Sequence, residues 1–228
     1  MDSKRLKTVS SFLRENDYFA DIGCDHGLLA LYAFELGIRR MQLIDNKEGP
    51  LNQAKTNLAH LADQCDITFT LSDGLTSLKP DIEVIAICGM GGKLISDILK
   101  RDLEKAKSLK RLILQPNTQI PDVRKFLSSA GFAIIDEAIV KEKRKIYEII
   151  VARYQDTYGQ LSKEDCYFGP RLRTVRSLLF LEKHQKRLAQ INKILNEPLS
   201  ANRYRELFQE KTMLERELTS LKEIENES

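Results

Sequence analysis

The chain has 228 residues, of which 42% are hydrophobic and 30% charged, and its 36 basic against 33 acidic residues give a net charge of +3. This composition excludes collagen-like, mucin-like and wholly disordered proteins, and the nearly balanced charge means that nucleic-acid binding would have to come from local patches. The four cysteines form no C-x-x-C pair, and no stretch approaches the roughly 18 apolar residues of a membrane helix. We therefore expect a cytoplasmic protein with no structural metal, no disulfide framework and no membrane partner.

The first part of the chain alternates between helical and strand-like patterns. A first amphipathic helix contains Leu6 and Val9 at helical spacing. Further along the chain, the patterns predict strands at 18–22, 40–45, 68–71, 84–88, 109–115, 132–140 and 146–154, and helices at 28–36, 50–65, 93–99 and 121–130. Alternation of this kind is typical of an α/β fold with a parallel sheet.

The last two predicted strands depart from this alternation. Only five residues, 141–145, separate them, and a loop of that length is too short for a right-handed crossover. The two strands must therefore form an antiparallel hairpin. The predicted fold is a Rossmann-like, mostly parallel seven-stranded sheet whose last strand is antiparallel.

Residues 159–228 have a different pattern, with two long helical stretches in which Pro198 ends the first and Ser200 can cap the second. Leucines recur at seven-residue spacing in both stretches: Leu181, Leu188 and Leu195, then Leu207, Leu214 and Leu221. The first stretch is basic and the second acidic, so the two are complementary in charge. The pattern predicts a coiled-coil-like antiparallel helical hairpin. We thus expect two domains, 1–158 and 159–228.

The segment 21–27, with the sequence DIGCDHG, follows the first predicted strand and opens a helix. Gly23 and Gly27 let the backbone approach a ligand closely and present N–H groups at a helix N-terminus. A dinucleotide-binding site would need G-x-G-x-x-G, which is absent, and Asp21 and Asp25 would repel a pyrophosphate. A ligand with a cationic, phosphate-free centre fits this loop better.

Two further acidic residues follow neighbouring strands. Asp45 ends the second strand, where a carboxylate can accept hydrogen bonds from both ribose hydroxyls of an adenosine. Asp73, followed by Gly74, ends the third strand, where a carboxylate can meet an adenine amino group. Taken singly, each of these acids has a plainer interpretation as a turn-forming or capping residue.

Together these positions resemble the S-adenosylmethionine site of class I methyltransferases, and the antiparallel final hairpin supports the same group. Asp25 departs from the usual loop because it stands where most members have the middle glycine. The resemblance implies a set of cofactor-binding residues, namely Asp21, Gly23, Cys24, Gly27, Asp45, Asn46, Asp73, Gly74 and Gly89.

The turns after the fourth and fifth strands read GMGG and QPN. The motif [D/N/S]-P-P-[Y/F], which many amino-methyltransferases use to hold an exocyclic amine, is absent. The glycine-rich turn can instead form a flexible floor beneath a planar ring, although a helix N-terminus without a ligand would have the same sequence. Gln115 and Asn117 offer amide donors and acceptors suited to a base edge, and Pro116 stiffens the turn between them.

The combination of DIGCDHG, GMGG, QPN and a C-terminal helical hairpin is similar to the bacterial tRNA adenine-22 N1-methyltransferase (TrmK) family. The resemblance covers essentially the whole chain and implies transfer of a methyl group from S-adenosylmethionine to N1 of adenine 22 in the D-arm of tRNA. In this interpretation Asp25, Gln115 and Asn117 are catalytic. The residues that line the target base are His26, Met90, Gly91, Gly92 and Pro116.

Basic residues in three stretches are candidates for contacts with RNA phosphates: Lys4 and Arg5, Lys143 and Arg144, and Arg171, Arg173 and Arg176. Each stretch alone is equally consistent with a solvated face, and the helical hairpin could serve as a dimerisation arm in a protein otherwise expected to be a monomer. Two other functions remain open at this point: a non-catalytic RNA-binding protein with this fold, or a methyltransferase with another substrate. A nicotinamide-dependent oxidoreductase is disfavoured by the missing dinucleotide motif.

Overall fold

A computed structural model describes residues 2–156 and 159–226, with side chains as far as residue 219. Its seven strands form one sheet in the order β3-β2-β1-β4-β5-β7-β6. Strand β7 lies between β5 and β6 and is antiparallel to both, whereas β1 to β5 are parallel to one another. The predicted fold and the antiparallel final strand are confirmed.

The predicted strands and most of the predicted helices occur within a few residues of their expected positions. The strands are β1 (Phe19–Ile22), β2 (Arg40–Asp45), β3 (Asp66–Leu71), β4 (Val84–Met90), β5 (Arg111–Pro116), β6 (Phe132–Glu142) and β7 (Lys145–Tyr154). The helices around the sheet are α1 (Lys4–Ser10), α2 (Leu28–Glu35), α3 (Glu48–Leu58), the short 3₁₀ helix η1 (Ala59–Leu61), α4 (Gly92–Arg101), α5 (Leu103–Ser108), α6 (Ile120–Ser129), α7 (Lys163–Phe168) and α8 (Pro170–Val175). Helices α5 and α7 were not predicted, and α8 is the separate beginning of the first long helical stretch expected in residues 159–228. None of the described helices is long and apolar enough to cross a membrane.

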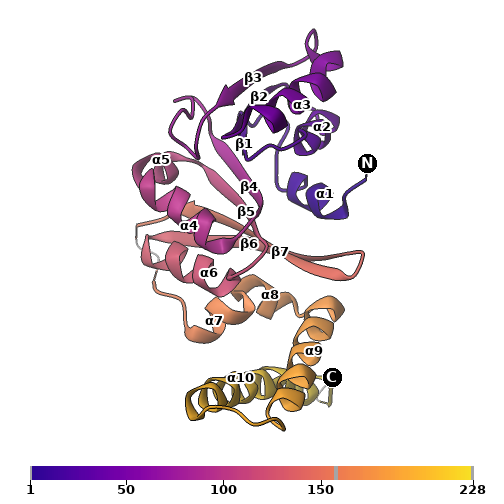
Figure 1. The fold of residues 1–228 in the computed structure, drawn as a ribbon, viewed down its shortest axis with the longest axis vertical. Helices are drawn as coiled ribbons and strands as arrows, with labels where there is room; N and C mark the ends of the chain where they lie inside the picture. The colour runs from indigo at the N-terminus through magenta and orange to yellow at the C-terminus, as the bar shows by residue number, and fades with distance from the viewer. Residues whose placement is uncertain (1, 157–158, 227–228) are drawn as a thin grey trace. The chain divides into compact units, whose positions relative to one another are not determined.

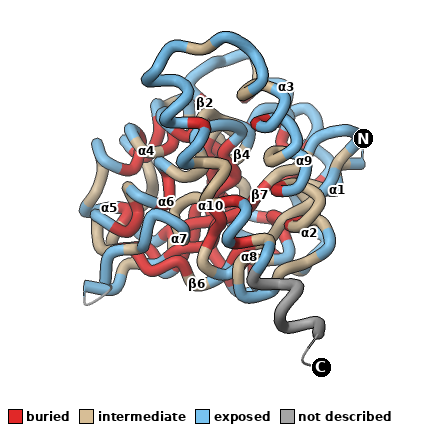
Figure 2. The backbone as a smooth tube through the Cα atoms, turned by 90° about the horizontal axis from the view of Figure 1, so that it is seen from below, coloured by how far each residue is buried: buried red, intermediate tan, exposed pale blue. Residues whose placement is uncertain are grey.

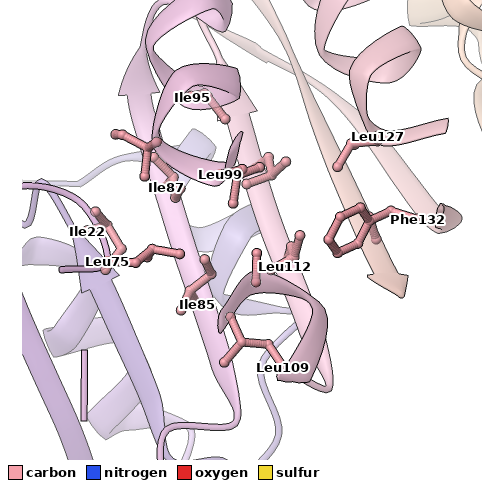
Figure 3. Close-up of a cluster of buried hydrophobic side chains, with 14 of the residues drawn as sticks. Ile22, Leu75, Ile85, Ile87, Ile95, Leu99, Leu109, Leu112, Leu127 and Phe132 are labelled. Carbon is pink, nitrogen blue, oxygen red and sulfur yellow. The ribbon is translucent and has the colours of Figure 1, made fainter. Parts of the chain in front are cut away.

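Helices lie on both faces of the sheet (Figure 1), and an apolar cluster on each face holds this layered structure together. Helices α4, α5 and α6 cover one face, where Leu99 and Leu127 pack on Ile85 and Leu112 of the sheet (Figure 3). Helices α1, α2 and α3 cover the other face. The strands between these layers are largely buried (Figure 2). Because β4 is buried on both faces along most of its length, its apolar, β-branched sequence suits a central strand.

The hairpin between β6 and β7 is tighter than expected. Glu142 pairs with Lys145, so the connecting turn contains only Lys143 and Arg144 instead of the five residues predicted from the sequence. Lys143 adopts a left-handed backbone conformation with φ of 55°, as a two-residue hairpin turn requires. The two cations are exposed at the tip of the hairpin.

The chain divides into two compact units, Met1–Arg173 and Thr174–Ser228. The expected boundary falls on residue 158, which lies outside the described residues, and the observed division comes 15 residues later. Helix α7 packs on α6 and therefore belongs to the first unit.

A buried arginine explains why the first unit extends this far. The fully buried guanidinium of Arg124 forms ion pairs at 2.7 Å with Glu137 and with Glu148, and it donates to the carbonyl of Cys166 at the end of α7. The other oxygen of Glu137 accepts the backbone N–H of Arg171 at 2.9 Å. Helices α7 and α8 are thus tied to the sheet through a single charged cluster.

The second unit is the predicted helical hairpin, formed by α9 (Leu178–Ile194) and α10 (Ala201–Asn226). The side chain of Ser200 accepts the N–H of Arg203 at 3.3 Å, which confirms the predicted cap. Leu207 and Leu214 are buried, whereas the side chain of Leu221 lies outside the described residues. The predicted charge complementarity is present in a two-pronged ion pair between Arg187 and Glu210, with both N–O distances at 2.7 Å.

We predict that Arg124→Met lowers the free energy of unfolding by about 3–5 kcal/mol, because two buried carboxylates lose their cation. Urea unfolding measures this loss. Lys125→Met, which removes an exposed cation from the adjacent position on α6, is the control and should change stability by less than about 0.5 kcal/mol. A similar small change in both variants would contradict a structural role for the Arg124 cluster.

Candidate active site

The candidate residues collect at one edge of the sheet. Strands β1, β2, β4 and β5 are parallel, so the loops that follow them meet beyond the same carboxyl end. The acidic glycine loop follows β1, and the GMGG and QPN turns follow β4 and β5. A site assembled from these loops is where open α/β sheets bind their ligands.

The loop after β1 is held by backbone hydrogen bonds to β2. The N–H groups of Gly23 and Cys24 both donate to the carbonyl of Ile44, at 2.8 and 3.1 Å. Gly23 has φ of +74°, and a Cβ atom there would lie 2.2 Å from the Cε of Met90. Gly27 has the same φ and packs closely against Leu58 of α3. The positive φ favours glycine at 23 and 27, whereas the neighbouring ends of the Met90 and Leu58 side chains could shift to make room.

Three carboxyl groups gather at this loop. Asp21 and Asp45 are buried at the ends of β1 and β2, and the backbone N–H of Asp25 donates to Asp45 Oδ2 at 3.3 Å. Burial raises the pKa of Asp21 to about 7, with a further upward contribution from Asp45 and Asp25 and a partly opposing one from Arg5. No group of acidic, histidine or cysteine side chains among the described residues could hold a metal ion. A ligand that carries organic positive charge would relieve the repulsion among these carboxylates.

Asp25 lies at the tip of the loop in a strained conformation. Its φ is +48°, in the left-handed region, and its carboxylate is exposed. The Nε2 atom of His26 lies 3.4 Å from Asp25 Oδ1, and the backbone carbonyl of His26 accepts a hydrogen bond from Asn57 of α3. A non-glycine residue in this conformation costs of order 1 kcal/mol, and such strain is found preferentially at functional sites.

The acidic residue after β3 has a partner that sequence reasoning missed. Arg101, at the end of α4, contacts the Asp73 carboxylate at 2.6 Å and its backbone carbonyl at 2.9 Å. The same guanidinium covers Gly74, where a Cβ atom would lie 2.4 Å from Nη2. Asn46 is exposed just beyond β2. Asp73, by contrast, is held in place by its pairing with Arg101. Nothing in the sequence indicates this pairing, since the two residues are 28 positions apart.

The turn after β4 contains glycines with different roles. Gly89 has φ of +77° and lies at a bulge between β4 and β5. A Cβ at Gly92 would lie 2.5 Å from the carbonyl of Thr118, so packing between the two turns already explains that glycine. Gly91 caps α4, and the side chain of Met90 lies against Gly23 of the loop after β1.

The two amide side chains after β5 differ from each other in exposure. Gln115 is fully buried, and its oxygen accepts from Arg5 Nη1 and from the N–H of Gly89, while its NH₂ group donates to the carbonyl of Pro116 and to Asn117 Oδ1, both at 3.2 Å. Its capacity for hydrogen bonds is complete, so it is not available to a base edge as expected from the sequence. Asn117 is exposed and donates one N–H to the carbonyl of Gly89 at 2.6 Å, which leaves one N–H and one lone pair.

The environment of the two cysteines at the site favours their protonated thiols. Burial raises the pKa of the Cys24 and Cys88 thiols far above neutral pH, and the nearby carboxyl of Asp21 adds to both shifts. Because a thiol reacts as its thiolate, both remain unreactive. The site can position and polarise ligands.

The candidate RNA-binding cations occupy distinct environments. Lys4, Lys143 and Arg144 are exposed, whereas the guanidinium of Arg5 points to Gln115 in the active site. The three arginines that follow are divided between the two units. Arg171 and Arg173 lie in the first unit, where Arg171 donates to the carbonyl of Ile134 and Arg173 pairs with Asp165, and Arg176 lies 3.7 Å from Glu217 in the second unit.

Comparison with known proteins gives a consistent result. Residues 19–223 match the family model described as TrmK, tRNA (adenine(22)-N(1))-methyltransferase. A Bacillus subtilis tRNA (adenine(22)-N(1))-methyltransferase is 35% identical over 193 residues, which cover 82% of this chain and 81% of that protein. The crystal structure of the B. subtilis m1A22 tRNA methyltransferase TrmK has a TM-score of 0.84 at 30% identity, covering 95% of this chain and 98% of that one. A Streptococcus pneumoniae structure in complex with S-adenosyl-L-methionine has a TM-score of 0.85 at 35% identity, covering 96% of this chain and 100% of that one.

We predict that the raised pKa of Asp21 makes the fold less stable as pH rises. The ordinary pKa of an aspartate is about 4, so between about pH 4 and pH 7 the folded protein keeps a proton on Asp21 that the unfolded chain has lost. The contribution of this group to the free energy of unfolding therefore falls by up to about 1.4 kcal/mol per pH unit. Urea titrations at several pH values should show that Asp21→Asn lacks this component. The exposed variant Asp63→Asn should follow the wild type, and a constant difference between Asp21→Asn and wild type at all pH values would contradict the shift.

Proposed function

Because the chain belongs to the tRNA (adenine(22)-N(1))-methyltransferase family, we propose that it transfers the methyl group of S-adenosylmethionine to N1 of adenine 22 in the D-arm of tRNA. The observation that carries this proposal is the arrangement of the sheet edge, where a carboxylate-rich glycine loop lies beside turns that present neutral amides. The proposal assigns this reaction to the cytoplasm, with the enzyme acting as a monomer.

The cofactor side of the site fits a small organic cation. S-adenosylmethionine carries an ammonium group and, when bound, supplies an electrophilic methyl group on a positively charged sulfur. In the proposed assignment the carboxylate of Asp21 holds the ammonium group, Asp45 accepts from the ribose hydroxyls and Asp73 accepts from the adenine amine. The backbone around Gly23 gives the cofactor room to approach.

The backbone of the other cofactor candidates, Cys24, Gly27, Asn46, Gly74 and Gly89, completes the proposed cofactor wall. The target-base side would consist of the turn residues Met90, Gly91 and Pro116 together with the Asn117 amide. Gly92 is assigned to packing because the carbonyl of Thr118 already occupies the space next to it.

The chemistry at the target base needs little from the protein beyond position. Adenine N1 has a lone pair in the plane of the ring, so no general base is needed to activate it, and in-line positioning can contribute about 7–11 kcal/mol in favourable cases. The remaining N–H and lone pair of Asn117 suit the Hoogsteen edge of adenine, where N7 accepts and the N6 amine donates, so that N1 stays free to attack the methyl group. Because N1 lies on the Watson–Crick edge, the target base must be unpaired when it enters the site.

We assign Asp25 a catalytic role, in which its carboxylate stabilises positive charge. The methylated ring carries a positive charge, and the exposed carboxylate of Asp25 at the loop tip can stabilise it, with His26 alongside. The strained backbone at Asp25 supports a functional role, because a glycine would adopt the same φ without cost.

For RNA binding we propose the exposed cations of the first unit. Lys143 and Arg144 at the hairpin tip and Lys4 on α1 are available for phosphate contacts. Arg171, Arg173 and Arg176, which form contacts within the protein, are assigned lower weight.

The proposal predicts methyl transfer to a single adenine. Unmodified tRNA transcripts incubated with labelled S-adenosylmethionine and digested to nucleosides should yield label in 1-methyladenosine, and transcripts with guanine in place of adenine 22 should yield none. Label in another nucleoside would retain the enzyme class but contradict the target. Cofactor binding by calorimetry without any label in tRNA would favour a non-catalytic protein or another substrate.

A second prediction concerns Asp25. Asp25→Gly should lower kcat by about 100-fold or more, since it removes the carboxylate near the reacting ring. It should also raise the free energy of unfolding by up to about 1 kcal/mol, because glycine tolerates φ of +48°. Cofactor affinity, measured by calorimetry, should change by less than about threefold, so a parallel loss of kcat and cofactor affinity would assign Asp25 to cofactor binding instead.

A further inference from the structure

The first turn of α1 reaches into the active site through Arg5. Its guanidinium donates to the side-chain oxygen of the buried Gln115, and its Cζ atom lies 5.5 Å from the centre of the Tyr147 ring. A Cβ atom on Gly89 would lie 3.6 Å from Arg5 Nη1. The arginine thus touches both turns that form the proposed floor for the target base.

This turn of α1 is fixed from several sides. Glu142 of β6 accepts hydrogen bonds from Ser3 Oγ at 2.8 Å and from the backbone N–H of Arg5 at 3.2 Å. Burial alone would raise the pKa of Glu142, but these hydrogen bonds and the charge of Arg5 lower it below its usual value. The backbone N–H of Ser3 also donates to the Tyr32 hydroxyl of α2 at 2.8 Å. Arg5 is therefore held by the fold and does not depend on RNA to order it.

We propose that Arg5 is a positioning residue for methyl transfer, which fixes the orientation of the Gln115 amide and, through it, the hydrogen-bonding face that Asn117 presents to the target base. This inference rests on the proposed function and changes the role expected for Arg5 from the sequence, where it was a candidate for phosphate contacts.

The argument follows from counting donors and acceptors. The guanidinium of Arg5 and the backbone N–H of Gly89 can only donate hydrogen bonds. The oxygen of Gln115 must therefore face both groups. The NH₂ group of Gln115 then faces the oxygen of Asn117. That contact in turn directs the NH₂ group of Asn117 to the carbonyl of Gly89. If Gln115 were reversed, its NH₂ group would oppose two donors, at the cost of unpaired buried polar groups.

The consequence is one defined pattern at the exposed end of the chain of amides. With Asn117 held this way, its second N–H and its second lone pair point away from Gly89 and Gln115. Without Arg5 the oxygen of Gln115 would keep only one donor, the N–H of Gly89, and the carbonyl of Pro116 would hold the NH₂ group from the other side. Misplacement of a substrate-positioning group by about 1 Å can cost roughly 100-fold in rate, so loss of this second donor should be visible in turnover.

A double-mutant cycle tests the proposal. Arg5→Met, Gln115→Met and the double variant are compared for kcat, KM for tRNA and cofactor affinity, with melting temperature as a check on folding. Each single variant should lower kcat by about 10- to 100-fold with little change in KM. The kcat of the double variant should be no lower than that of the less active single variant. Arg5→Lys retains a cationic donor at this position and should recover part of the rate, even if Arg5→Met is poorly folded. Arg14→Met removes an exposed arginine from the same N-terminal segment and should retain wild-type kinetics.

A phosphate-binding role would give a different result. Lys143→Ala/Arg144→Ala provides the reference for lost phosphate contacts, with a raised KM for tRNA and a shallower dependence on salt. If Arg5→Met shows that same pattern, or if its effect multiplies with that of Gln115→Met, the positioning role is wrong.

A spectroscopic measurement separates this proposal from the proposed function. In ¹H–¹⁵N spectra of the protein alone, Arg5→Met should shift the backbone signal of Gly89 and the side-chain NH₂ signals of Gln115 and Asn117, whereas Arg14→Met should leave them in place. Unchanged signals would overturn the proposal whether or not the wild type methylates tRNA. Shifted signals in a protein that does not methylate tRNA would contradict the proposed function and leave the role of Arg5 in orienting these amides intact.

Discussion

The burial of one carboxyl group, that of Asp21 at the end of β1, imposes a constraint on the whole loop that follows this strand. Strand β1 lies between β2 and β4, so Asp21 is surrounded by protein, and Asp45 and Asp25 add negative charge beside it. The pKa of about 7 means that the folded protein bears an electrostatic cost at neutral pH which a bound cation would remove. The tight turn at Gly23 and the strained Asp25 are further local costs in the same loop. The loop is therefore built for a ligand at the expense of its own stability.

The rest of the first unit compensates for this loop with rigid support. Apolar clusters on both faces of the sheet fix the strand ends, and the Arg124 cluster ties α7 and α8 to β6 and β7. Glu142 of the same hairpin clamps the first turn of α1, so residues near the N-terminus and residues beyond 110 meet at one site. The β6–β7 hairpin, which extends from the sheet (Figure 1), thus has two structural roles. Glu137 binds the backbone of α8 at the end of the unit, and Glu142 near the tip binds the backbone of Arg5.

The sequence was sufficient to predict the order of elements, the antiparallel hairpin and the loops that line the site, because each depends on local periodicity, on loop length or on glycine placement. It was insufficient wherever a contact joins distant positions. The pairing of Arg101 with Asp73 and that of Arg5 with Gln115 span 28 and 110 residues, and no local pattern reports either of them. The late unit boundary has the same origin, since a single arginine in α6 holds α7. Gln115 was predicted to face the base because an amide after a strand suits that role, and only its burial reveals that its bonds are already used.

The distribution of charge across the site bears on how the proposed reaction would be divided between affinity and rate. Methyl transfer moves positive charge from the cofactor's sulfur to the target ring, so carboxylates close to the cofactor stabilise the starting complex at least as well as the transition state. Groups of that kind improve binding without accelerating the chemical step. In the proposed assignment Asp21 and Asp45 therefore contribute to cofactor affinity. Acceleration has to come from groups that interact more strongly with the ring as it becomes charged, and the exposed carboxylate of Asp25 is one of these. Alignment by neutral amides is the other source, and it brings no charge that would oppose the cationic product. The guanidinium of Arg5 would oppose it. Its contacts with Gln115 and Tyr147 hold it in place, and the nearby negative charge of Glu142 partly balances its charge, so the arginine can orient the amides.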